Sequence, residues 1–250
     1  MKRGVIIGDS HTVCLAEAAR SDEQFGQDFE IFRLRRERGY NDSDAKTLDE
    51  IEKIVAGLSA SVPIYLSFLG TYHNIVGLLN IRPEYDFLLD AADVVNPKVR
   101  QIIPFRAIVS AFDSHIGSAN TIQKIKQVAA GPVFILASPP PKNDTKFVTD
   151  RLLSMKKQQY HGHQIAEIGV NDPLVRLKLW KVESMRIQNW AEQFGMGYIM
   201  PPKDCLSEAG FLDKFYYAND ATHANSEYGK RLLAELVNDS HSVSGRAAND

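Results

Sequence analysis

The amino-acid sequence predicts an α/β protein built on a mostly parallel, five-stranded sheet covered by helices. Short apolar runs alternate with longer segments whose apolar residues recur at helical spacing, which is a βαβ pattern. Runs such as "VFILA" are continuously apolar, as expected for strands buried on both faces of a sheet. Polar or small residues follow three of the runs, at the strand ends where parallel sheets carry their active groups. The five runs are Gly4–Ile7, Phe29–Leu34, Val62–Leu69, Pro132–Ala137 and Met196–Met200.

The length of 250 residues favours one domain that carries an insertion. We expect this domain to span residues 1–237, with a helical insertion around residues 142–194. Two helix-like stretches in that region, Lys146–Gln159 and Leu174–Phe194, exceed the length of a minimal crossover. Residues 238–250 are polar and small, and we expect them to form a flexible tail.

Composition and charge argue against several classes of function. Hydrophobic residues make up 44% and charged residues 24% of the chain, and the net charge of -2 disfavours binding to nucleic acid through its phosphates. The first strand begins within a few residues of Met1, and no stretch approaches the ~20 apolar residues of a membrane span. We therefore expect a cytoplasmic protein without a nucleic-acid or membrane partner, in which Cys14 and Cys205 are free thiols.

The sequence predicts neither a cofactor nor a metal. The turn "GDSH" lacks the Gly-x-Gly-x-x-Gly pattern of a dinucleotide-binding turn, and no Gly-Lys-Ser/Thr phosphate loop occurs. A metal site built from His11, His73 and His223, with Asp9 nearby, is conceivable in geometry. No His-Glu-x-x-His motif or tight ligand cluster supports it, however, so we do not expect one.

The stretch "GVIIGDSH" places Ser10 directly after the first strand. A serine hydroxyl is a poor nucleophile until a base takes its proton, and that base needs a third group to orient it. Ser10 is therefore either a nucleophile at the end of a buried strand or the cap of the helix that follows.

A histidine that could serve as the base stands before the final helix. In "DATH", Asp220 lies three residues before His223, and at this spacing its carboxylate can curl back to the ring nitrogen. Asp220 could then orient His223, although an Asp-x-x-His pair before a helix is also commonly a solvated cap. The pair in combination with Ser10 at the first strand end favours the chemical interpretation.

These two blocks resemble those of the SGNH hydrolases, also called GDSL-type esterases and lipases. The family's first block is Gly-Asp-Ser at the first strand end and its last block is Asp-x-x-His, which "GDS" at residues 8–10 and "DATH" match in order and placement. The resemblance implies a flavodoxin-like three-layer α/β/α sandwich. It also implies that Ser10 is the nucleophile, His223 the general base and Asp220 its orienting partner. His11 stands where the family usually has leucine.

The resemblance is weaker at the oxyanion hole, which in the family combines the serine N–H, a glycine after the second strand and an asparagine after the third. Each such donor can contribute ~3 kcal/mol. Gly39 in "ERGYN" is a candidate for the glycine, or an ordinary turn residue. In "GTYHN", Gly70 is kept but Tyr72 replaces the asparagine. Asn74 could supply the amide if the loop is reshaped; otherwise Thr71 or backbone groups complete the hole.

His11 and His73 each follow a strand end that should face the site, so either could meet substrate, with surface or capping roles as the alternatives. We expect a serine esterase that hydrolyses an acetyl or other short-chain ester on a small molecule or carbohydrate. The same residues could instead transfer the acyl group to an acceptor hydroxyl. A noncatalytic glycan- or protein-binding module on the same fold is the further alternative, because the third block is altered.

Overall fold

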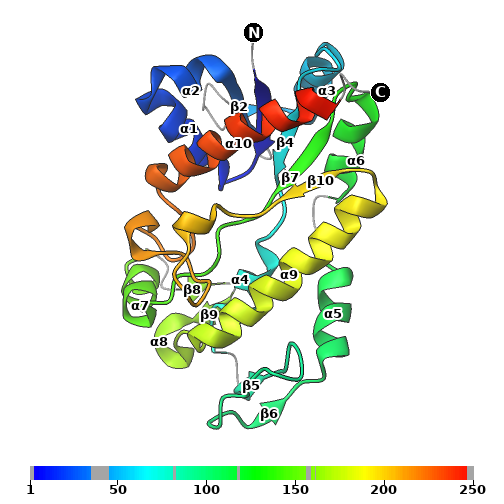
Figure 1. The fold of residues 1–250 in the computed structure, drawn as a ribbon. Coiled ribbons are helices and arrows are strands. Elements are labelled where there is room, and N and C mark those ends of the chain that lie inside the picture. Colours follow the sequence, from blue (N-terminus) through cyan, green and yellow to red (C-terminus); the bar gives the residue numbers. More distant parts are fainter. Residues whose placement is uncertain are drawn as a thin grey trace.

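The centre of the molecule is a six-stranded sheet with the order β10-β7-β4-β1-β2-β3, and every neighbouring pair of strands is parallel. The computed structural model describes residues 3–34, 45–80, 83–116, 119–155, 159–160 and 162–246. Figure 1 shows the sheet with helices on both sides of it. Its strands are β1 (Gly4–Gly8), β2 (Phe29–Leu34), β3 (Ala45–Lys46), β4 (Ile64–Ser67), β7 (Val133–Leu136) and β10 (Gly197–Ile199).

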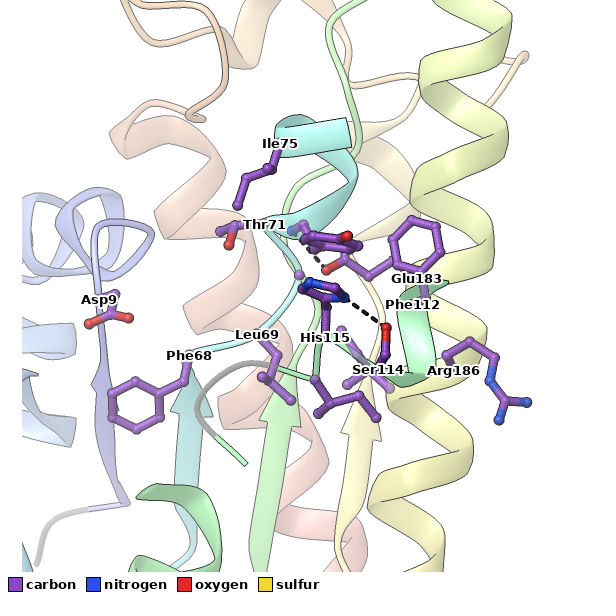
Figure 2. A pocket seen from close by; sticks show the side chains of 14 residues that line it. Asp9, Phe68, Leu69, Thr71, Ile75, Phe112, Ser114, His115, Glu183 and Arg186 are labelled. Atoms are coloured by element: carbon purple, nitrogen blue, oxygen red, sulfur yellow. Dashed lines mark hydrogen bonds between the residues drawn. The ribbon is translucent and has the colours of Figure 1, made fainter. Parts of the chain in front are cut away.

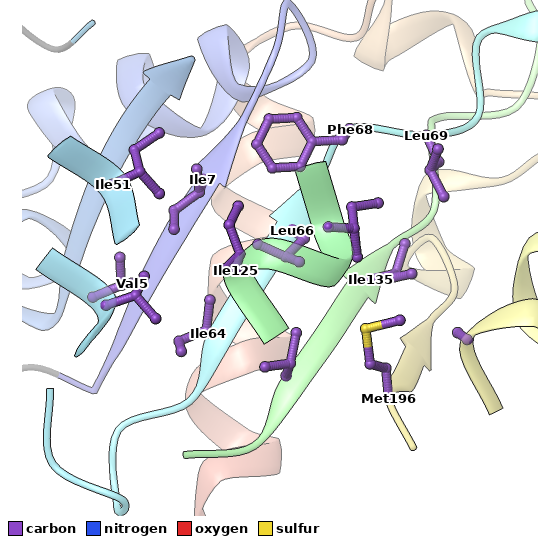
Figure 3. Close-up of a cluster of buried hydrophobic side chains, with 14 of the residues drawn as sticks. Val5, Ile7, Ile51, Ile64, Leu66, Phe68, Leu69, Ile125, Ile135 and Met196 are labelled. Atoms are coloured by element: carbon purple, nitrogen blue, oxygen red, sulfur yellow. The ribbon is translucent and has the colours of Figure 1, made fainter. Parts of the chain in front are cut away.

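One face of the sheet is covered by α3 (Leu48–Ala56), α6 (Ala119–Val128) and α9 (Pro173–Gln193). Side chains of β1, such as Val5 and Ile7, pack there against apolar residues of these helices (Figure 3). Because successive side chains of a strand point to opposite faces, Ile6 lies in a second cluster on the other side.

The second face is covered by α1 (Thr12–Ser21) and α10 (Ser226–Arg246). Leu15 of α1 and Leu233 of α10 are fully buried in this cluster together with Ile6. The result is the three-layer α/β/α sandwich that the sequence predicts, and burial on both faces explains why the strands are continuously apolar.

The remaining helices and strands are short and lie in the segments that connect the sheet strands with the helices covering them. Figure 1 shows several of them gathered at one end of the molecule, from which α9 runs up along the sheet. The helices are α2 (Glu23–Asp28), α4 (Tyr72–Gly77), α5 (Phe105–Asp113), α7 (Thr145–Leu153), α8 (Ile165–Ile168), η1 (Lys203–Cys205) and η2 (Lys214–Tyr216), and the short strands are β5 (Tyr85–Asp86), β6 (Gln101–Ile102), β8 (Gln159–Tyr160) and β9 (His163–Gln164).

The structure corrects three details of the sequence-based expectations. The sheet has six strands and not five, because the edge strand β3 pairs with β2 over two residues only and leaves no apolar run in the sequence. The helix expected over Lys146–Gln159 ends at Leu153, since its buried side chains are confined to Val148 and Leu152. The last helix continues through Arg246, into the segment expected to be a tail, because a helix propagates easily once its first turns are packed.

In the described part of the chain, no helix combines the length and apolar composition needed to cross a membrane. Cys14 and Cys205 are buried free thiols, as the sequence predicts.

Candidate active site

The turn between β1 and α1 holds Ser10 at the carboxyl edge of the sheet. A Cβ atom on Gly8 would collide with the carbonyl oxygen of Ser67 in β4, so glycine is needed for this close approach. The Asp9 N–H then donates to the same carbonyl at 3.1 Å. Helix α1 begins at Thr12 and its N-cap residue is His11, whose side chain makes no capping hydrogen bond. The Ser10 side chain is exposed and free to serve another purpose.

The hydroxyl of Ser10 meets the histidine that precedes α10. Ser10 Oγ lies 2.9 Å from His223 Nε2, and His223 Nδ1 lies 2.9 Å from Asp220 Oδ2. These distances are those of hydrogen bonds, so the three side chains form one row from hydroxyl to imidazole to carboxylate. The structure thus brings together the three residues that the sequence singles out as nucleophile, base and orienting partner.

The Asp220 carboxylate is fixed by its own loop. Its Oδ1 accepts the backbone N–H groups of Thr222 at 2.8 Å and His223 at 2.7 Å. Burial alone would raise the pKa of Asp220, but the hydrogen bonds and charge of His223 and the Thr222 N–H outweigh it and hold the pKa well below the usual range. An ionised carboxylate only accepts hydrogen bonds, so His223 Nδ1 carries a proton. In the neutral form of the ring, Nε2 then faces Ser10 as an acceptor.

A second histidine lies against the ring of His223. The His11 and His223 rings are 4.9 Å apart and tilted by 53°, and His11 is buried. No group in the described part of the chain bonds to its Nδ1 atom. Burial, and then the nearby charges of His223 and His73, lower the pKa of His11 to about 3, partly opposed by Asp220. His11 is therefore neutral near pH 7 and places no positive charge beside the base.

The loop after β4 carries the third-block candidates. Gly70 has φ +91, and a Cβ atom there would lie 2.6 Å from Ser138 Oγ, so the kept glycine is required by the backbone. Thr71 follows it on the surface and lines a cavity. Asn74 is buried within α4 and is absent from the described walls of both cavities near Ser10. Gly39 lies outside the described residues.

Glu183 of α9 occupies the N-terminus of α4. Its carboxylate accepts the N–H groups of Tyr72 at 2.9 Å and His73 at 3.0 Å, and it also lies 2.6 Å from His73 Nδ1. These two backbone donors are therefore unavailable to an oxyanion.

In the described part of the chain no group accepts the Ser10 N–H, which leaves that donor free.

Two cavities flank the turn that carries Ser10. The first, of about 440 Å³, contains the triad, His11 and several polar side chains from both neighbouring helices. The second, of about 760 Å³, runs from Asp9 to Arg186 (Figure 2). Its wall includes the parallel stack of Tyr72 on His115, with ring centroids 4.4 Å apart. His11 thus lies where it could meet substrate, whereas His73 is absent from the described walls of both cavities.

The described residues contain no group of three or more His, Cys, Asp or Glu side chains arranged to hold a metal ion. His11 is turned toward His223, and His73 is paired with Glu183.

Two residues of the site's surroundings were not singled out from the sequence. Glu183 lies in the middle of a long helix, where one acidic residue gives no signal. Lys142 is buried beneath the Asp220 loop and belongs to "SPPPKND", the polar segment after β7. Its place at a strand end is the one signal that could have drawn attention to it.

Comparison with known proteins supports the fold. No model of a known protein family matches the chain, and no curated protein sequence matches it. A provisionally assigned acylhydrolase from Bacteroides fragilis is similar in structure, with a TM-score of 0.50 and 10% identity over 97% of this chain and 88% of that chain. A GDSL-like lipase from Bacteroides thetaiotaomicron has a TM-score of 0.48 and 13% identity, over 97% of this chain and 89% of that chain.

A carbohydrate acetylesterase from Sinorhizobium meliloti is more distant, with a TM-score of 0.42 and 12% identity over 97% of this chain and 100% of that chain. The three-layer architecture and its resemblance to the Bacteroides fragilis structure define the fold as that of the SGNH hydrolases. The chain is thus an α/β protein of the SGNH hydrolase fold, with a Ser-His-Asp row at the carboxyl edge of its sheet.

Proposed function

We propose that this protein is a serine esterase that hydrolyses a short acyl ester. The observation that carries the proposal is the continuous row in which Ser10 Oγ, His223 and Asp220 are joined by contacts of 2.9 Å. A serine beside a neutral, carboxylate-oriented imidazole is the arrangement that activates a hydroxyl for acyl transfer.

In the proposed reaction, Ser10 Oγ attacks the ester carbonyl while His223 Nε2 takes the hydroxyl proton. His223 then returns this proton to the leaving alcohol as the carbon–oxygen bond of the ester breaks, and an acyl group remains on Ser10. A water molecule attacks the acyl-enzyme with His223 again as base, which releases the acid and restores the hydroxyl. Asp220 stays ionised throughout and stabilises the imidazolium that forms twice in each cycle.

The Ser10 N–H is the oxyanion donor that we propose with most structural support, because nothing in the described part of the chain accepts it. Gly39, Gly70 and Asn74 stay candidates for the remaining donors. Asn74 would have to leave its buried position in α4 to donate to an oxyanion. The backbone groups of Gly70 and Thr71, which line the cavity beginning at Asp9, are therefore the preferred candidates.

The size and polarity of the cavity at the triad support a small, hydroxylated substrate. The cavity of about 440 Å³ is lined by Glu17, Asn219 and Ser226 in addition to the triad. These side chains can hydrogen-bond to alcohol groups, as a sugar would require. We therefore propose an acetyl or similar short acyl group, carried by a carbohydrate or another polar alcohol.

Acyl transfer to an acceptor hydroxyl is a second candidate, because a larger cavity of about 760 Å³ begins at Asp9, next to the nucleophile. An acceptor bound there could resolve the acyl-enzyme in place of water. Product analysis with an acetyl ester and a sugar acceptor distinguishes the two reactions, since a transferase yields acetylated sugar and a hydrolase yields acetate.

A noncatalytic glycan- or protein-binding module is the alternative from a different class. It is favoured by Tyr72 in the third block and by the use of the first N–H groups of α4 by Glu183. This alternative predicts that a fluorophosphonate leaves Ser10 unmodified in the folded protein while glycans raise the melting temperature.

Replacement of Ser10 by alanine tests the proposed function. The Ser10→Ala variant should lose hydrolysis of p-nitrophenyl acetate because no hydroxyl remains to form the acyl-enzyme. Its circular dichroism spectrum and melting temperature should stay close to those of the wild type, since Ser10 is exposed and its side chain does not cap α1. Activity equal to that of the wild type would contradict the proposal.

A further inference from the structure

Lys142 places a buried ammonium group beneath the loop that holds Asp220 and His223. The side chain is fully buried, and its Nζ donates hydrogen bonds to the carbonyl oxygens of Ala218 at 2.8 Å and Asp220 at 2.6 Å. The Asp220 Oδ1 atom lies 3.8 Å from the same nitrogen. A buried charge is costly unless it is paired and hydrogen-bonded, so these contacts account for how the lysine is tolerated.

The loop around this ammonium group, residues 217–224, is closed by its own backbone. Tyr217 and Ala224 form an antiparallel bridge, and the Ala218 N–H donates to the His223 carbonyl at 3.1 Å. Within this closed segment, two carbonyl oxygens point inward to Lys142. The lysine therefore holds the segment at Ala218 and Asp220, whereas the bridge holds it at its base.

Lys142 is itself held in place from several sides. Its carbonyl oxygen accepts a hydrogen bond from Arg176 Nη1 of α9 at 2.8 Å, and its backbone forms an isolated bridge to Leu212. The ammonium group lies over the rings of Phe147 and Tyr217, 5.1 Å and 5.0 Å from their centres. These contacts fix both ends of the side chain, so the position of Nζ is determined by the fold and not by the loop alone.

We propose that Lys142 is a positioning residue, which sets the place of Asp220 and thereby the orientation of the His223 ring toward Ser10. The inference rests on the proposed esterase function. A displacement of about 1 Å in a catalytic constellation can lower the rate about 100-fold, so a modest shift of this loop has a large effect.

The charges around Lys142 agree with this role. Burial lowers the pKa of Lys142 to about 8, while the Asp220 carboxylate raises it and the Arg151 cation lowers it. The Arg176 guanidinium is near as well, but it is bonded to the Lys142 carbonyl. Near pH 7 the ammonium form is the major one, so a positive charge lies beside the ionised orienting carboxylate.

Replacement of Lys142 by methionine tests the proposal, because methionine keeps an apolar stem of similar length and removes the donors. With p-nitrophenyl acetate, we expect kcat to fall about 100-fold and KM to stay within about threefold. The matched control is Lys146→Met in α7, where the lysine is 85% exposed and pairs with its neighbour Asp150. This control should have the kcat of the wild type. Both variants are assayed well below their melting temperatures.

Lys142→Arg keeps the charge and the hydrogen-bond donors. We therefore expect its kcat to be at least tenfold higher than that of Lys142→Met. If Lys142→Met does not fold, Lys142→Gln replaces it in the comparison and should have at least tenfold lower kcat than Lys142→Arg, because glutamine is shorter and uncharged. A lower melting temperature with unchanged kcat would overturn the proposal, and so would equal kcat values in Lys142→Arg and Lys142→Gln.

The Ser10→Ala variant is measured in the same assay to separate two failures. Activity in Ser10→Ala equal to that of the wild type would contradict the esterase mechanism itself. Loss of activity in Ser10→Ala together with full kcat in Lys142→Met would contradict only the role of Lys142.

Discussion

The hydroxyl of Ser10 could cap a helix or react, and the structure separates these two uses. The cap position of α1 falls on His11, and Ser10 Oγ lies 2.9 Å from His223 Nε2 instead. The side chain of Ser10 is exposed to solvent, and the His223 ring behind it is hydrogen-bonded to Asp220. At this scale the geometry favours a nucleophile.

Asp220→Asn changes one atom of the orienting carboxylate and should lower kcat by about 10⁴-fold, as in other serine triads. The asparagine oxygen can still accept the backbone N–H groups of Thr222 and His223, so the loop keeps its hydrogen bonds. The amide nitrogen would then face His223 Nδ1 and favour the tautomer with its proton on Nε2, which cannot accept the proton of Ser10. Steady-state kinetics with p-nitrophenyl acetate give kcat.

Thermal melting serves as the control for Asp220→Asn, because a loss of folding would also reduce activity. A well-folded Asp220→Asn variant with kcat within fivefold of the wild type would show that Asp220 does not orient the base.

The proximity of Ser10, Asp220 and His223 could be expected from the sequence, whereas the contacts around these three residues could not. Ser10, Asp220 and His223 stand in short motifs with a recognisable order. The contacts of Lys142 with the Asp220 loop join residues 76 and 78 positions apart, and Glu183 contacts His73 from 110 positions away. Such pairings depend on how loops and helices pack, and no local pattern encodes them.

Among the elements, α4 shows how the altered third block is accommodated. Its first turn would normally leave backbone N–H groups open, but Glu183 accepts two of them and pairs with His73. The carboxylate ties α4 to α9 at the point where the loop from β4 enters the site. The position of Gly70 at the strand end could be expected from the sequence, but the contact of Glu183 with α4 could not.

Glu183→Ala should reduce the free energy of unfolding by about 3 kcal/mol, because it leaves buried hydrogen-bond donors of α4 without an acceptor. Urea denaturation followed by circular dichroism measures this loss. Glu192→Ala on the same helix is the matched control. Its carboxylate makes an exposed contact with Gln188, so the replacement should change stability by less than about 0.5 kcal/mol. Equal stability of the two variants would disprove a capping role for Glu183.

Long, fully buried elements could be predicted from the sequence, whereas short elements and helix ends could not. Strands such as β1 and β4 are buried along their whole length and could be found from their apolar runs. The edge strand β3 has two residues, and the end of α7 depends on the tertiary contacts of Val148 and Leu152. Short elements and helix ends are decided by packing, and for that reason the sequence does not reveal them.

At the scale of the whole molecule, the parallel sheet assembles a site from the two ends of the chain. Ser10 and His223 are 213 positions apart, and they meet because β1 lies in the middle of the sheet while α10 packs beside α1. His11, at the start of α1, is buried in the folded protein, and this burial lowers the pKa of its ring.

Stability should therefore fall as the pH is lowered from 7 to 5. His11 has a pKa of about 3 in the folded protein, against about 6.5 for a free histidine. Between these values the unfolded chain binds a proton that the folded protein does not, so acid favours unfolding. The titration of His11 should lower the free energy of unfolding by about 2 kcal/mol between pH 7 and pH 5.

The His11→Leu variant lacks the titrating group, so its free energy of unfolding should fall by about 2 kcal/mol less than that of the wild type over this pH range. Urea denaturation at the two pH values measures the difference. An identical loss of stability in both proteins would mean that His11 is not held neutral by the fold.

The most direct test of the central claim is to identify the residue that reacts with a fluorophosphonate in the folded protein. We expect a single adduct, located on Ser10 by peptide mapping and mass spectrometry, and we expect it to form much more slowly in His223→Ala, which lacks the base. The absence of an adduct on the folded wild-type protein, or an adduct on a serine other than Ser10, would contradict the claim that Ser10 is an activated nucleophile.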